Sequence, residues 1–218
     1  MNKVMMEKEN NNVYNMAFTA GAAMLSETLA VAEAYLDCGQ DWELTREKTI
    51  KENLMSKGKL SSNQRYFQLM KQRIEVLNNE EIQMLVHGSV SARRQLILLA
   101  ICKAYRLIFD FINENVRECF YNFHESISYA NFNEFFNEKK YEHPEMEKIS
   151  ELSIYKMRQV IFRILEQTEL IESAESGELR RPYLTEELER MIVKDDAKWL
   201  AIYLYSNNEI SNLHDLYA

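Results

Sequence analysis

The sequence predicts an all-α fold: a compact globular helical protein with two helix-turn-helix elements, the second winged-helix-like with a small β-hairpin. Only 5 Gly and 2 Pro occur in 218 residues, so the chain has few of the residues that break helices and form turns between short strands. Apolar residues make up 46% of the chain and aromatic residues 11%, which is enough to bury a core. They recur mostly at helical spacing, and this period favours helices over strands.

The chain is long enough for one large domain or two small ones, because a single core is usually filled by roughly 100–200 residues. We expect a flexible N-terminus at 1–12, because this stretch is polar and rich in Asn. The remaining residues divide by pattern into an N-terminal helical bundle (13–125), a winged-helix-like region (126–185) and a C-terminal helical tail (186–218).

The first helix-turn-helix is predicted at 42–77. The helix before it is apolar at helical spacing and stops at Gly39, a position typical of a C′ glycine. Asp41 then has the position of an N-cap for the next helix, which ends before the turn SKGKL. A second helix begins near Ser61, which has capping-box spacing to Gln64.

A long central helix is expected at about 91–120. Asn78 or Asn79 caps a short helix that precedes it, and Ser89 or Ser91 begins the long helix itself. Nearly all its side chains between 96 and 112 are apolar, so the helix is predicted to be the buried centre of the protein. The polar exceptions fall on one narrow edge: Lys103, Arg106, Asp110, Asn113 and Arg117.

Residues 126–185 have the element order of a winged helix, three helices followed by a hairpin. The helices are predicted in the segments SYANFNEFFNEKK, HPEMEKIS and ELSIYKMRQVIFRILEQT, with Pro144 suited to a first-turn position. Two short extended pieces then flank a turn that carries Ser176 and Gly177, which predicts the β-hairpin. In the tail, TEELERMI is predicted as a helix and DAKWLAIYLY as a helix or a strand.

The charge is unevenly distributed along the chain. The formal net charge of −8 and a pI near 5.2 argue against a protein that coats nucleic acid over its whole surface, because neutralising phosphates needs clustered Lys and Arg. Residues 42–77 nevertheless carry 8 basic and 4 acidic side chains. The acidic total therefore hides a local positive region, and this region coincides with the first helix-turn-helix.

The helix at 62–77 is the first candidate for contact with DNA. Its core face is predicted to contain Phe67, Met70, Ile74 and Leu77. The opposite face holds side chains that can read base edges, since Arg pairs with guanine and Gln with adenine. These side chains are Arg65, Gln68 and Gln72, with Lys57, Lys59, Lys71 and Arg73 nearby for phosphates. The alternative is that Gln, Arg and Lys are simply good helix formers on a solvated face.

The helix at 152–168 is the second candidate. Its outer face carries Lys156, Gln159 and Arg163, and the hairpin adds Arg180 and Arg181 where a wing touches backbone phosphates. Residues 150–184 hold only 5 basic against 6 acidic side chains, which weakens the electrostatic case. The alternative here is a structural winged helix that serves protein contacts.

Motifs of enzymes and of metal or cofactor sites are missing from the sequence. The four His are widely spaced with no HExxH, and the five Gly stand alone without a phosphate-cradling loop. We therefore expect a non-enzymatic protein with no metal, no cofactor and no small-molecule substrate. General acid–base roles need partner groups that the sequence does not show.

A cytoplasmic, reduced setting is expected. The three Cys are an odd number without CxxC spacing, and MNKVMMEKENNNVYN does not resemble a signal peptide. The most apolar run, at 95–112, is interrupted by Lys103, Arg106 and Asp110 before it reaches the ~20 apolar residues that a membrane span needs. We expect no membrane partner.

Three stretches occur in an order that resembles a known family. They are YNMAFTAGAAMLSETLAVAEAYLDCGQDW, LVHGSVSARRQLILLAICKAYRLIFDFINENVRECF and YEHPEMEKISELSIYKMRQVIFRILEQTELI. Together they cover roughly 14–185 and resemble the BrxA family, a small core component of bacterial BREX phage-exclusion systems, sometimes labelled NusB-like. The tail from about 186 does not take part in the resemblance.

The resemblance implies an all-helical, non-enzymatic factor with two helix-turn-helix elements that works alongside other BREX proteins. Duplex DNA is the partner it implies, through the elements at 42–77 and 131–184. It transfers no functional residues, so the candidates named above rest on their positions on the two helices. Two other functions stay open: an assembly adaptor that binds other BREX proteins, and a NusB-like protein that binds structured single-stranded RNA.

Overall fold

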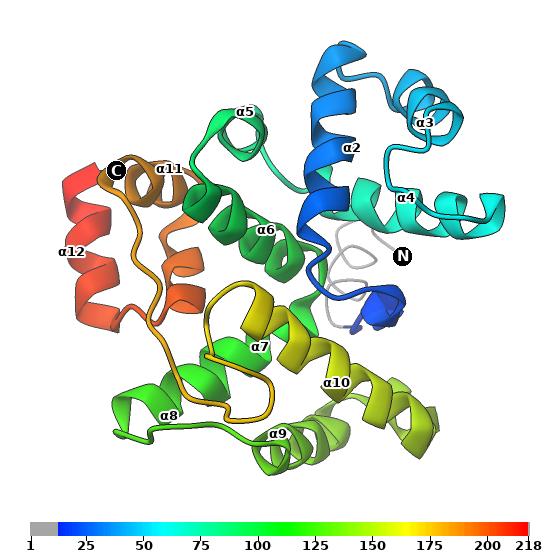
Figure 1. Ribbon diagram of the computed structural model, residues 1–218. Helices are drawn as coiled ribbons and strands as arrows, with labels where there is room; N and C mark the ends of the chain where they lie inside the picture. The colour runs from blue at the N-terminus through cyan, green and yellow to red at the C-terminus, as the bar shows by residue number, and fades with distance from the viewer. Residues whose placement is uncertain (1–12, 218) are drawn as a thin grey trace, which may run out of the picture.

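The computed structural model describes residues 13–217, and the predicted flexible N-terminus lies outside the described residues. Every regular element in this part of the chain is helical (Figure 1), so the all-α prediction is confirmed. The elements are η1 (Ala17–Ala20), α2 (Leu25–Asp37), α3 (Trp42–Lys51), α4 (Leu60–Ile74), α5 (Asn79–His87), α6 (Val90–Ala104), α7 (Arg106–Phe111), η2 (Ile112–Val116), α8 (Arg117–Tyr121), α9 (Tyr129–Glu142), η3 (Pro144–Lys148), α10 (Glu151–Gln167), α11 (Glu186–Asp196), η4 (Ala197–Tyr203) and α12 (Asn207–Tyr217).

The helices form three groups around α6, which lies at the centre of Figure 1. α2, α3 and α4 pack on one another in the first group, and α7 to α10 form the second. α11, η4 and α12 form the third and pack against one another. None of the helices among the described residues is long and apolar enough to span a membrane.

The capping residues largely match the sequence predictions. Asp41 accepts hydrogen bonds from the first-turn amides of α3, and Asn78 forms a full capping box with Glu81 at the start of α5. Gly39 follows α2 in the left-handed region, with φ of 64°, as a C′ glycine does. The box predicted between Ser61 and Gln64 is wrong, because α4 already begins at Leu60 and has no side-chain cap.

The single central helix predicted at about 91–120 is also wrong. Tyr105 adopts an extended backbone, with φ of −131° and ψ of 90°, and so separates α6 from α7. Its side chain is fully buried, its ring packs edge-on against Phe18, and its hydroxyl donates to Oε1 of Gln72 over 3.3 Å. The π-helical η2 then interrupts the region again. The tertiary partners of Tyr105 explain a break that the apolar run of the sequence conceals.

Lys103 does not lie on a water-facing edge as predicted. Its ammonium group is 2.8 Å from both carboxylate oxygens of Glu81 and 2.8 Å from Asp195, and only 7% of its side chain is exposed. Burial raises the pKa of Glu81, and the Lys103 ammonium opposes that effect. This buried cluster joins α5, α6 and α11.

The wing of the predicted winged helix lacks paired strands. The described residues between 169 and 184 take part only in isolated antiparallel bridges, Ser126 with Glu178 and Ile171 with Leu179. Gly177 occupies the turn with φ of 63°, and an added Cβ would meet the carbonyl oxygen of Ile127 at 1.8 Å. The three helices predicted before the wing form as α9, η3 and α10, with Pro144 at the start of η3.

The C-terminal tail folds back on the wing region through Glu209. Its carboxylate accepts hydrogen bonds from the amide of Ser206 and from Nη2 of Arg181, both over 2.7 Å. Partial burial would raise the pKa of Glu209, but these hydrogen bonds outweigh that effect and lower it to about 2. The stretch DAKWLAIYLY, for which the sequence allows a helix or a strand, contains the 3-10 helix η4.

Arg73 lies inside the protein. Its side chain is fully buried at the end of α4, where Nη1 donates to the carbonyls of Ala22 and Ala23 over 2.8 and 3.1 Å. Nη2 donates to the carbonyl of Gly21 over 3.0 Å. Burial lowers the pKa of the guanidinium. Arg73 therefore holds the turn that leads into α2.

We expect Arg73→Met to lower the free energy of unfolding by about 2–5 kcal/mol, because three carbonyls would lose charge-assisted donors in a buried site. Urea denaturation followed by circular dichroism measures this change. Arg65→Met, on the exposed face of the same helix, is the matched control and should change stability by no more than about 0.5 kcal/mol. Equal losses in the two variants would contradict the structural role of Arg73.

The lowered pKa of Glu209 makes part of the stability depend on pH. A carboxyl whose pKa is lower in the folded state than its ordinary 4.5 stabilises the fold above that value. The stabilisation is lost as the pH falls from about 4.5 toward about 2. Melting curves across this range should therefore show a shallower decline for Glu209→Gln than for the unchanged protein. Parallel declines would show that Glu209 does not contribute.

Candidate nucleic-acid interface

The first candidate surface is the outer face of α4. The predicted core residues Phe67, Met70, Ile74 and Leu77 are all buried, which confirms the orientation of this helix. α2 and α3 pack against it and against each other. Because the apolar stripe points inward, the opposite face of α4 is turned toward solvent.

The side chains predicted to read bases differ in their solvent exposure and in their hydrogen-bond partners. Arg65 and Gln68 are exposed, and Arg65 forms no ion pair with any residue that the structure describes. Gln72 is half-buried and accepts the hydrogen bond from Tyr105. Arg65 and Gln68 therefore form the accessible centre of this face.

The lysines predicted to contact phosphates also differ in their exposure and in their neighbours. Lys59 is exposed, while Lys71 is half-buried with its ammonium 5.4 Å from the centre of the Trp42 ring. Lys57 forms a 2.7 Å ion pair with Glu27 of α2 and lies 5.0 Å from the ring centre of Tyr66. Surface pairs of this kind are weak, so Lys57 keeps part of its attraction for anions.

The prediction that Arg73 contacts a phosphate is wrong. Its guanidinium binds the carbonyls of 21–23 and has no exposed surface, so it does not reach a phosphate. The sequence contains the signal for this position, because Arg73 stands three residues after Met70 and next to Ile74, close to the core face. The apparent excess of basic side chains at 42–77 therefore overstates the charge at the surface.

The face of α4 still stands out by its lack of carboxylates. None of its residues, LSSNQRYFQLMKQRI, is acidic, in a chain that holds 34 Asp and Glu. α3 adds Arg46 and Lys51, which are exposed and form no ion pair within the described part of the chain. The sequence reveals only their contribution to the local charge and does not predict them as site residues.

The second candidate surface is the outer face of α10. Ile161, Ile164 and Leu165 are buried and turn Lys156 and Gln159 toward solvent, as predicted. The amide of Gln159 donates to the hydroxyl of Tyr155 over 2.9 Å. Arg163 is exposed and lies 3.5 Å from Glu166 one turn further along.

The two arginines of the wing already form ion pairs with carboxylates of the protein. Arg180 forms a 2.6 Å ion pair with Glu172, and Arg181 binds Glu209 and stacks on the ring of Tyr205. The Glu172 carboxyl raises the pKa of the adjacent Glu178, which reflects the concentration of negative charge there. The wing is therefore poorly suited to contact phosphates.

The two candidate helices are held by the same segment. η1 packs against both α4 and α10, and Figure 1 shows the two helices on the same side of the molecule with η1 between them. The amide of Ala23 also donates to Oε1 of Gln167 at the end of α10 over 2.9 Å. η1 and the segment after it thus connect the two candidate helices, while the outer faces of these helices remain separate surfaces.

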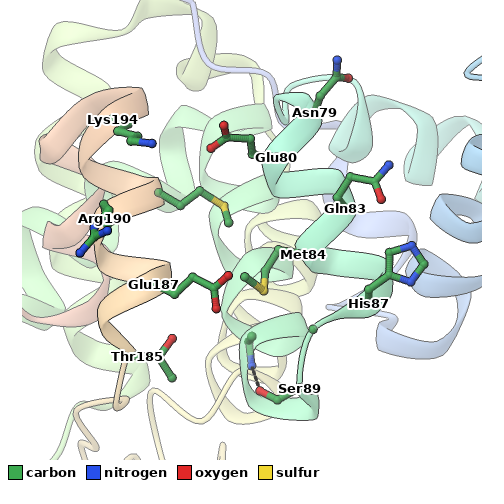
Figure 2. Close-up of a pocket in the computed structure, with 13 residues that line it drawn as sticks. Asn79, Glu80, Gln83, Met84, His87, Ser89, Thr185, Glu187, Arg190 and Lys194 are labelled. Atoms are coloured by element: carbon green, nitrogen blue, oxygen red, sulfur yellow. Dashed lines mark hydrogen bonds between the residues drawn. The ribbon is translucent and has the colours of Figure 1, made fainter. Parts of the chain in front are cut away.

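A further hollow lies elsewhere, between α5 and α11 (Figure 2). It measures about 830 Å³, and its lining includes Met84 and Met191. Charges of both signs surround these apolar side chains, with Glu80 on α5, and Glu187 and Lys194 on α11. No group of three or more possible metal ligands occurs anywhere in 13–217. The hollow thus combines apolar side chains with charged groups of both signs.

Comparison with known proteins places this fold in a family. The family model BrxA matches residues 12–196. A protein named BREX protein BrxA from Bacillus cereus (strain H3081.97) is 28% identical over 152 residues, which cover 70% of this chain and 72% of the relative. Another of the same name, from Escherichia coli O9:H4 (strain HS), is 24% identical over 172 residues, covering 79% and 80%.

A solved structure shares the fold. The crystal structure of an uncharacterized protein from Magnetospirillum magneticum has a TM-score of 0.76 and 21% sequence identity, and the match covers 88% of this chain and 97% of that one. This similarity speaks for the arrangement of helices alone. Because the family model matches most of its length, the chain belongs to the BrxA family.

Proposed function

We propose that this protein is a cytoplasmic, non-enzymatic component of a BREX phage-defence system that binds duplex DNA through the outer face of α4. Its relatives named BREX protein BrxA support the assignment to such a system. The observation that carries the DNA assignment is the exposed, carboxylate-free face of α4 in a protein of net charge −8. Acidic proteins bind DNA only where basic side chains are locally concentrated.

The packing of α2, α3 and α4 supports a helix-turn-helix arrangement. In such a motif the second helix enters the major groove, and the helix before it lies across the backbone. With α4 in the groove, Arg65 has the chemistry to pair with guanine and Gln68 with adenine. Arg46 and Lys51 of α3 then serve as backbone contacts. The connection at 52–59 is longer than the usual turn of this motif.

The element order around α10 supports a winged-helix arrangement for the second candidate. The bridge at Ser126 precedes α9 and α10, and the bridge between Ile171 and Leu179 follows them. The carboxylates of the wing argue against the contacts predicted for Arg180 and Arg181. We therefore infer that this element approaches DNA, if it takes part, through α10 rather than through the wing.

An assembly adaptor is the second candidate function. The hollow between α5 and α11 favours it, because Met84 and Met191 offer adaptable apolar contact and the charges around them can orient a partner. Under this alternative the protein binds other BREX proteins without DNA.

We expect the protein to bind a labelled random duplex with an affinity that falls steeply as salt increases, because phosphate contacts release counterions. Arg65→Glu should weaken binding by about tenfold or more and reduce the salt slope by about 1. Fluorescence anisotropy across a salt series measures both quantities. Lys194→Glu, an equal charge reversal on α11, is the matched control.

Comparable weakening in Arg65→Glu and Lys194→Glu would mean that only the net charge matters, and would contradict the assignment to α4. Absence of binding at low salt would contradict DNA binding altogether. Competition with unlabelled single-stranded RNA distinguishes RNA binding from DNA binding. A protein that prefers RNA would release the labelled duplex when the RNA is added.

The adaptor function predicts that other proteins of the same system co-purify with this one after nuclease treatment. Met84→Glu should abolish that co-purification, because it places a charge among the apolar side chains of the hollow. Leu216→Glu, at an exposed apolar position on α12, is the control and should leave it intact. Retention of the partners by Met84→Glu, with an unchanged melting temperature, would exclude this surface.

A further inference from the structure

A second hollow lies between α9 and α10 and has a different chemical character from the one between α5 and α11. Its volume is about 470 Å³, and polar side chains dominate its lining. Its cations are Lys140 of α9 and Arg158 of α10. Neither forms an ion pair with a carboxylate of the described residues. Two positive side chains thus share a concave site without a protein counter-charge bound to them.

Arg158 is held in place before any ligand arrives. Its Nη1 donates to Oδ1 of Asn133 over 2.9 Å, and the guanidinium lies 4.5 Å from the ring centre of Tyr129. The ring of Tyr155 lies 5.4 Å away. Stacking of this kind fixes the plane of the guanidinium, so little conformational freedom is lost when it binds an anion.

The same guanidinium retains an unused donor. Nε of Arg158 is buried and has no hydrogen-bond partner within 13–217. A buried donor without an acceptor is unfavourable, and an acceptor that reaches it restores the missing hydrogen bond. A protein carboxylate on α9 would have satisfied it, but Asn133 and Asn137 stand there instead.

The remaining lining residues set the charge and polarity of the site. Asn137 adds an amide donor, and Phe136 and Ile154 supply apolar surface. Glu151 is the carboxylate of the lining and stands in the first turn of α10, where the helix dipole stabilises it. Two cations against one carboxylate leave the hollow positive, in a protein whose total charge is strongly negative.

We propose that the hollow between α9 and α10 binds a phosphate group, through Lys140, Arg158 and the amide of Asn137. A planar guanidinium with an unused donor, a mobile ammonium and a neutral amide together match the several acceptor oxygens of phosphate. The group comes either from the backbone of bound DNA or from free phosphate. This site is separate from α4 and does not depend on DNA reading by that helix.

The first test adds inorganic phosphate to the full-length protein and follows the Nε–Hε signal of Arg158 by NMR. We expect a saturable shift of this signal. The shift should need at least about tenfold more phosphate in Asn137→Asp, a nearly isosteric change that adds a carboxylate, and in Lys140→Glu. Lys148→Glu, a nearby exposed lysine outside the lining, is the matched control and should titrate like the unchanged protein.

The second test measures duplex DNA binding by the same variants. Weakening of about fivefold or more in Asn137→Asp and Lys140→Glu, with little change in Lys148→Glu, assigns the site to a backbone phosphate. Unchanged DNA affinity together with a saturable phosphate shift assigns it to free phosphate. The proposal is overturned if the Arg158 signal does not respond and DNA affinity is unchanged, or if all three variants weaken both interactions equally.

Discussion

The bond between the Arg73 guanidinium and the carbonyls of 21–23 is the interaction on which the arrangement of the helices depends. It fixes the turn between η1 and α2 to the end of α4. The same segment reaches the second half of the chain, since the amide of Ala23 binds Gln167 and the hydroxyl of Tyr14 donates to Asp110 over 2.7 Å. A short stretch near the N-terminus thus holds α4, α7 and α10 in one framework.

This framework depends on charges that are costly to bury. Arg73 has carbonyls and no carboxylate as partners, and Lys103 with Glu81 forms a buried pair between α6 and α5. Such groups stabilise a fold mainly by penalising arrangements in which they lose their partners. The two candidate surfaces therefore have a definite relative position, because the segment that separates them cannot shift without leaving Arg73 unpaired.

The sequence predicted the elements whose signals are local and missed those that depend on distant partners. The core face of α4 follows from its helical period and is confirmed. Capping chemistry leaves the start of α5 open between Asn78 and Asn79, and the structure has Asn78 as the cap. The break at Tyr105 depends on Phe18 and Gln72, which no local pattern reveals. At the candidate site Arg65 and Gln68 were placed correctly on the exposed face. The prediction for Arg73 is wrong because it follows from the positive charge of the side chain. The position of Arg73, three residues after the buried Met70, places it near the core face instead.

Negative charge restricts where this protein can meet a nucleic acid. A phosphate backbone is repelled by the wing, where Glu172 and Glu178 stand together and Arg180 is already paired. This repulsion is absent along α4, which has no carboxylate, and at the hollow between α9 and α10, which has a net positive charge. η1 packs against both α4 and α10, whereas Glu80 and Glu187 lie at the hollow between α5 and α11. The distribution of charge therefore favours α4 and the hollow between α9 and α10 over the wing as surfaces for a polyanion, while the hollow between α5 and α11 carries charges of both signs.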